Sequence, residues 1–179
     1  MKRSFLIFSV SFFLISSFGF IQVKPPVKKL HGYKQASIPG IEPNFPNENE
    51  TEHTERKPRI NYNYWFYLEM TGTEKIDIKG LWISGIAHDI KTETIDRLPV
   101  KKIIYTGSDK NDTIVMVPFT KKKVLLAYPK GISKDTVIRS KYIRTITRAN
   151  ELVISYLWKN KIYYLLIKKL KEINPDVRQ

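Results

Sequence analysis

From position 61 onward, the apolar residues of this sequence recur with a period of two. In residues 61–70 (NYNYWFYLEM) the even positions carry Tyr, Tyr, Phe, Leu and Met, and the odd positions carry a mixture of polar and aromatic residues. Successive side chains of a strand point to opposite faces of a sheet, so this alternation and the aromatic content predict a strand. A chain with this pattern is constrained to bury sheet faces rather than helical stripes.

Similar runs follow, separated by segments rich in Gly, Asn, Asp and Pro. They predict strands at residues 76–79, 81–83, 101–106, 113–120, 123–128, 152–158 and 162–167. Gly80 predicts a bulge, and Pro118, which has no N–H for a ladder, predicts an edge or a bulge. Lys159 and Asn160 predict a two-residue hairpin turn, because Asn tolerates a positive φ. Residues 137–149 fit both a helical row and a strand, and we expect a strand or an irregular segment there.

Seven or eight short strands without a βαβ alternation predict an all-β fold. We expect a single small β-sandwich, with an immunoglobulin-like topology as one option, and a small open β-barrel is the alternative. The 179 residues allow one ordinary domain. Since the chain has no cysteine, it excludes the Cys–Trp–Cys immunoglobulin core, disulfides, thiolate zinc sites and a cysteine nucleophile.

The first residues predict export. Lys2 and Arg3 precede an uncharged apolar stretch, residues 4–20, and Ser17 and Gly19 are the small residues that a signal peptidase accepts. Residues 1–23 are therefore either a cleaved signal peptide or an uncleaved membrane anchor. Both alternatives place the rest of the chain outside the cytoplasm, in the periplasm or the cell envelope.

The composition divides the rest of the chain into a proline-rich segment, a domain and a short tail. Residues 24–59 contain six prolines and a polar, acidic run at residues 47–55, which predicts a flexible tether. The sandwich is expected at residues 60–174, and residues 175–179 form a C-terminal tail.

Basic residues are concentrated in the last third of the chain. Of a net charge of +14, residues 121–179 contribute +11, from fifteen basic and four acidic residues. The candidate anion-binding residues are Lys121, Lys122, Lys123, Arg139, Lys141, Arg144 and Arg148. Such a surface attracts an acidic envelope protein, an anionic polymer or acidic lipid headgroups, but it also serves simply as a solvated exterior. Export argues against a nucleic acid as the partner.

Trp65, Tyr67 and Trp82 form a second candidate set. Flat aromatic rings on an outer sheet face stack against sugar rings, whereas the same residues commonly cover a core. This set predicts, as an alternative function, a carbohydrate-binding module for an acidic glycan.

The sequence offers little for catalysis. His88 is expected in an exposed loop, and the carboxylates between residues 69 and 96 are scattered. We expect no catalytic residue, metal or cofactor, and a carboxylate-based hydrolase is the least favoured alternative. The leading hypothesis is a non-enzymatic envelope protein that binds a partner through its basic C-terminal surface or an open strand edge, such as that of residues 61–70.

Overall fold

The computed structural model describes residues 24–37, 61–104, 111–134 and 140–175, and strands account for 64% of them. The described elements are β1 (Val27–Ser37), β2 (Asn61–Met70), β3 (Asp77–Ile83), β4 (Ile86–Ile95), β5 (Val100–Ile104), β6 (Asp112–Val117), β7 (Val124–Ile132), α1 (Lys141–Ala149), β8 (Leu152–Trp158), β9 (Lys161–Ile167) and β10 (Lys171–Ile173). The all-β prediction is confirmed.

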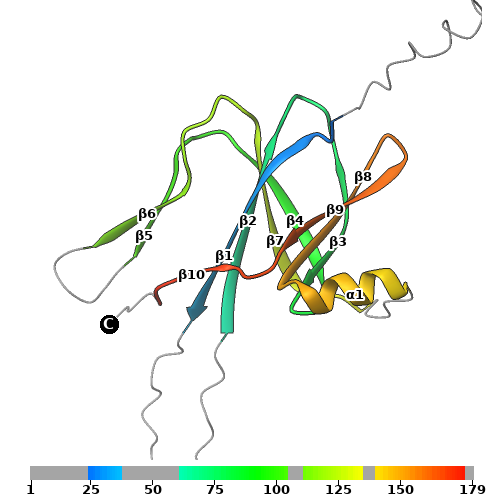
Figure 1. The fold of residues 1–179 in the computed structure, drawn as a ribbon. Helices are drawn as coiled ribbons and strands as arrows, with labels where there is room; N and C mark the ends of the chain where they lie inside the picture. The colour runs from blue at the N-terminus through cyan, green and yellow to red at the C-terminus, as the bar shows by residue number, and fades with distance from the viewer. Residues whose placement is uncertain (1–23, 38–60, 105–110, 135–139, 176–179) are drawn as a thin grey trace, which may run out of the picture.

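Eight of these strands form one sheet in the order β10-β1-β2-β7-β4-β3-β8-β9, while β5 and β6 form a separate two-stranded ribbon. All described pairs are antiparallel except β1 with β10. The large sheet curls into a half-barrel, and the β5–β6 ribbon projects on one side of it (Figure 1). Of the two architectures suggested by the sequence, the open barrel is therefore the closer description, because one sheet curls where a sandwich needs two facing sheets.

Each face of the curled sheet carries a core. The inner face buries Phe66, Leu68 and Met70 of β2 together with Ile154 and Tyr156 of β8. On the outer face, residues of β1 and β2 pack against β5 and β6. The ribbon thus covers apolar surface that one curled sheet leaves outside.

The two ends of the sheet approach each other where β9 leads into β10. Gly32 of β1 lies so close to this passage that a Cβ on it would stand 2.6 Å from both Ile167 Cδ1 and Leu170 Cδ2. Glu151 Oε1 accepts a hydrogen bond from Lys34 Nζ at 2.9 Å, and its Oε2 accepts one from the Leu170 N–H at 2.7 Å. One carboxylate therefore joins β1 to the passage and helps to close this end of the half-barrel.

The prediction of a flexible tether is wrong for Val27–Ser37, which forms β1. The prolines flank this strand at Pro26 and Pro39 and do not interrupt it, so its N–H groups are free to pair. It pairs with β2 on one side and β10 on the other, and it buries Tyr33 and Gln35. Residues 1–23 and 38–60 lie outside the described residues.

The expectation of a strand or an irregular segment at residues 137–149 is wrong for Lys141–Ala149, which is a helix, while residues 137–139 lie outside the described residues. Thr147 is buried, and its hydroxyl donates to the Ile143 carbonyl at 2.8 Å. Asn150 Nδ2 donates to the Ile146 carbonyl at 2.8 Å and satisfies an end group of the helix. These contacts and the packing of α1 on β8 outweigh the weak strand preference of Thr and Ile.

Other local predictions agree with the structure. The hairpin of β8 and β9 turns at Lys159 and Asn160, which have φ values of 48° and 59°. The register of β3 shifts between Ile78 and Gly80, where a bulge was predicted. The open edge suggested for residues 61–70 is present in part: β1 pairs along one side of β2, and β7 pairs with residues 66–69 on the other side. Residues 61–65 have no β7 partner in the described ladder.

Candidate functional site

The predicted basic residues do not form one surface. Lys121, Lys122 and Lys123 lie in the connection between β6 and β7, where Lys122 meets Lys28 of β1. The pKa of Lys122 is lowered, chiefly by its side-chain contact with Lys28. Two like charges held together favour the approach of an anion.

Lys141, Arg144 and Arg148 lie on α1, at the other end of the sheet (Figure 1). Lys28 is near the start of β1, whereas Glu151, just after α1, pairs with Lys34 six residues further along the strand. At 3.3 Å per residue, Lys28 and Lys34 are about 20 Å apart along β1. The lysines at 121–123, near Lys28, are therefore separated by a similar distance from the basic residues of α1, near Lys34. Arg139 lies outside the described residues.

The aromatic set does not form a sugar-binding platform. Tyr67 is only 4% exposed and belongs to the outer core, beneath the ribbon. Trp65 is half-buried, and Lys102 Nζ covers its ring at 4.5 Å from the centroid. Trp82 lies three strands away from Trp65 in the sheet, on the order of 14 Å, with its indole against Gly80.

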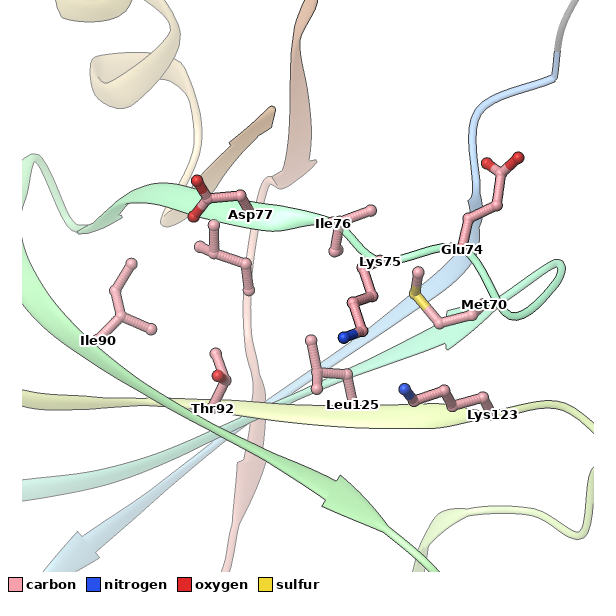
Figure 2. A pocket seen from close by; sticks show the side chains of 10 residues that line it. Met70, Glu74, Lys75, Ile76, Asp77, Ile90, Thr92, Lys123 and Leu125 are labelled. Atoms are coloured by element: carbon pink, nitrogen blue, oxygen red, sulfur yellow. The ribbon is translucent and has the colours of Figure 1, made fainter. Parts of the chain in front are cut away.

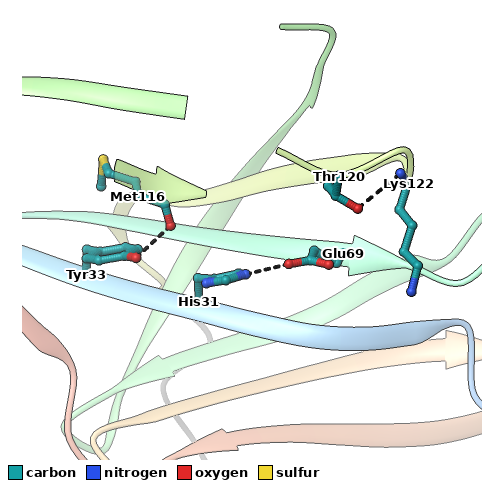
Figure 3. A network of polar contacts seen from close by, with 6 residues as sticks. All are labelled: His31, Tyr33, Glu69, Met116, Thr120 and Lys122. Carbon is teal, nitrogen blue, oxygen red and sulfur yellow. Dashed lines mark hydrogen bonds and ion pairs between the residues drawn. The ribbon is translucent and has the colours of Figure 1, made fainter. Parts of the chain in front are cut away.

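A buried polar pair that the sequence did not reveal lies on the outer face of β1 and β2. His31 Nε2 and Glu69 Oε1 are 2.7 Å apart, and the Tyr33 hydroxyl donates to the Met116 carbonyl at 2.6 Å (Figure 3). Lys122 reaches into the same region, where its charge interacts with that of Glu69. These contacts tie the ribbon and the β6–β7 connection to the sheet. Because His31 belongs to the segment predicted as a tether, nothing in the sequence pointed to this pair.

His88 lies within β4, half-buried, and not in the exposed loop that was predicted. Burial lowers the pKa of its imidazole, and its Nδ1 is buried without a hydrogen-bond partner in the described part of the chain. It pairs across the sheet with Leu81 and Ile132, both apolar.

Three of the scattered carboxylates are engaged in local contacts. Glu69 binds His31, Asp77 pairs with Lys79, and Glu93 accepts a hydrogen bond from the Tyr128 hydroxyl at 2.7 Å. Within the described residues, no three His, Cys, Asp or Glu side chains gather as a metal site would require. Nor does the described chain contain a helix with the length and apolar character needed to cross a bilayer.

β9 forms one end of the eight-stranded sheet, so one side of this strand is an exposed edge. β9 ends the sheet order and has seven residues, whereas β10 at the other edge has three. Its outward-facing side chains include Ile162 and Leu166, which are 57% and 46% exposed. Tyr164 follows the same face and makes a T-shaped contact with Tyr142 of α1, with their ring centroids 5.4 Å apart.

Comparisons with protein families, curated proteins and solved structures gave no match for this chain.

Proposed function

We propose that the chain is an exported, non-enzymatic interaction module that binds an acidic, extended segment of another envelope protein along β9. The export signal expected in residues 1–23 supports the compartment. The observation that carries the binding mode is the coincidence of exposed apolar side chains with unpaired backbone groups on the same residues of one edge strand.

The hairpin turn determines which backbone groups of β9 face away from β8. Positive φ values at Lys159 and Asn160 define a two-residue turn, in which the flanking Trp158 and Lys161 exchange both hydrogen bonds. Along an antiparallel ladder, hydrogen-bonded pairs alternate with non-hydrogen-bonded pairs. Every second residue of β9 from 162 onward therefore directs its N–H and C=O away from β8. These residues are Ile162, Tyr164 and Leu166, and the described residues provide no backbone partner for them.

The exposed side chains of β9 also favour strand addition at this edge. Ile162 and Leu166 share the outward face of β9 with Tyr164, beside Tyr142 of α1, which is 56% exposed. An added strand would bury these apolar groups through its own alternate side chains. Exposed apolar area next to an open edge is otherwise an aggregation risk that proteins avoid.

The charge around β9 favours an acidic partner. Residues 159–171 contain five lysines and no acid. Edge lysines hinder the addition of neutral strands and favour a segment with alternating acidic residues. They also disfavour a second copy of this chain, because a β9–β9 seam would bring two such sets of lysines together.

Hydrogen exchange tests the free edge and the binding mode with the full chain. In the free protein, the amides of Ile162, Tyr164 and Leu166 should exchange faster than those of Tyr163, Leu165 and Ile167. Displayed random heptapeptides should yield binders that alternate acidic and apolar residues. Adding such a peptide should slow exchange at the three outward amides, and binding should weaken as salt increases.

Leu166→Pro and Leu166→Ala form a matched pair of variants. Both remove the side chain, but only proline removes the outward N–H, and it does so without a loss from the β8 ladder. Peptide binding should be lost in Leu166→Pro and kept, though weakened, in Leu166→Ala. Equal binding by both variants, or slowed exchange confined to other strands, contradicts strand addition; binding of polyglutamate without slowed exchange shows attraction by charge alone.

A further inference from the structure

A cavity of about 330 Å³ opens on the inner side of the half-barrel, at the end where β2 leads into β3. Five apolar side chains line it: Met70, Ile76, Ile78, Ile90 and Leu125. They come from β2, the β2–β3 connection, β3, β4 and β7, so the curl of the sheet assembles the cavity (Figure 2). Met70, with its flexible thioether side chain, is an adaptable wall.

Two ammonium groups meet at this cavity. Lys75 comes from the β2–β3 connection and Lys123 from the start of β7, and Figure 2 shows both amino groups turned toward the space beside Leu125. Neither has an ion-pair partner among the residues that the structure describes. Their charges therefore remain available to a ligand.

The acidic side chains on the rim do not neutralise these lysines. Glu74 lies 3.9 Å from Lys159 Nζ, and Asp77 pairs with Lys79. In Figure 2 both carboxylates point away from Leu125, on the side opposite to the two ammonium groups. The cavity thus combines an apolar floor with two ammonium groups on one side of its rim.

We propose that this cavity binds a small anionic amphiphile, a carboxylate with a medium-length alkyl chain. The carboxylate pairs with Lys75 and Lys123 through charge-assisted hydrogen bonds, and the chain lies over Ile90 and Leu125. At about 30 Å³ per water-sized group, the cavity accommodates roughly ten such groups, which corresponds to an acid of about eight to ten carbons. A neutral or cationic amphiphile of the same length lacks the ionic contacts.

The test is a titration of the full chain with sodium decanoate, monitored through the methyl NMR signals of Met70, Ile90 and Leu125. Decanol and decyltrimethylammonium supply the same tail without the negative charge, and acetate supplies the head group alone. Decanoate should shift the cavity methyl signals, whereas each of the three controls should bind at least about tenfold more weakly, since each lacks the ionic contacts or the apolar burial.

Three variants separate the contribution of the two lysines from that of the cavity space. Lys75→Gln/Lys123→Gln should weaken decanoate binding about tenfold or more, whereas Lys101→Gln/Lys130→Gln, an equal loss of charge on exposed residues outside the cavity, should leave the affinity within about twofold. Thr92→Phe should fill the cavity and block decanoate, with little change in the spectrum of the remaining core.

Several results would overturn the proposal. Equal affinity for decanol or decyltrimethylammonium, unchanged binding by Lys75→Gln/Lys123→Gln, or methyl shifts confined to residues outside the cavity would each do so. Attachment to phosphatidylglycerol vesicles that decanoate does not displace would show a general attraction of surface lysines and not this site.

Discussion

His31 Nε2 and Glu69 Oε1 are 2.7 Å apart on the outer face of the sheet, and both side chains are 10% exposed. The contact links β1 to β2 beneath the β6–β7 connection (Figure 3). A buried carboxylate needs such a partner, because its desolvation is costly unless its oxygens accept hydrogen bonds. The pair therefore stabilises the strand that the sequence did not reveal.

His31→Ala should lower the free energy of unfolding by about 2–3 kcal/mol, because it leaves the Glu69 carboxylate buried and unpaired. Urea denaturation measures this loss. Lys29→Ala, on an exposed position of the same strand, should change stability by less than about 0.5 kcal/mol. Similar losses in both variants would show that the contact between His31 and Glu69 contributes nothing to stability.

Gly32→Ala should destabilise the fold by about 1–3 kcal/mol, because the new methyl group meets Ile167 and Leu170 at 2.6 Å in a closely packed region. Gly72→Ala is the control, since nothing stands within 4 Å of its added Cβ. The double variant Gly32→Ala/Leu170→Ala should be less destabilised than the sum of the single variants, because removing the Leu170 side chain makes room. Strict additivity would contradict the close approach of β1 to the β9–β10 passage.

Local strand patterns could be predicted from this sequence because they depend on neighbouring residues. The alternation in residues 61–70 and the turn at Lys159 and Asn160 both correspond to observed elements. In contrast, Tyr67 and Glu69 are buried although they lie on the more polar face of β2, because β5, β6 and the connection to β7 cover them. The sequence of a strand does not reveal which other segments of the chain will pack over it.

β1 was missed for a related reason. Its neighbourhood is rich in proline and lysine, and its stability comes from pairing with β2 and with β10, which is about 140 residues away in the chain. Likewise, the distribution of charge along the sequence pointed to the lysines at 121–123, but it did not show that they lie apart from the basic residues of α1. It gave no indication that Lys75 lies beside Lys123. The convergence of Lys75 and Lys123 requires the sheet order, which composition does not provide.

The turn of the β8–β9 hairpin should respond oppositely to two substitutions at one position. Asn160 has a φ of 59°, so Asn160→Ala should cost about 1 kcal/mol, whereas Asn160→Gly should be neutral or stabilising by a few tenths. Thermal unfolding of the two variants measures the difference. An equal effect of alanine and glycine would be inconsistent with a left-handed residue at this position.

Alkaline pH should unfold the chain partly through Tyr67. Burial, with a smaller contribution from Tyr33, raises the pKa of Tyr67 to about 12 from its ordinary value of 10.0. The unfolded chain loses this proton near pH 10 and the folded chain only near pH 12, so the stability present below pH 10 decreases as the pH rises through this window. Two pKa units correspond to about 2–3 kcal/mol.

Tyr67→Phe isolates this contribution from the lysines, which titrate in the same range. The Tyr67 hydroxyl makes only a long contact with Met116 Sδ, at 3.7 Å, so the variant should lose little stability at pH 8. Between pH 8 and pH 11.5, urea denaturation should show a smaller loss of stability in Tyr67→Phe than in the unmodified chain, by about 2 kcal/mol. Tyr128→Phe, at an exposed hydroxyl bound to Glu93, should retain the full alkaline loss. Parallel pH profiles for Tyr67→Phe and the unmodified chain would mean that this hydroxyl is not buried beneath the ribbon.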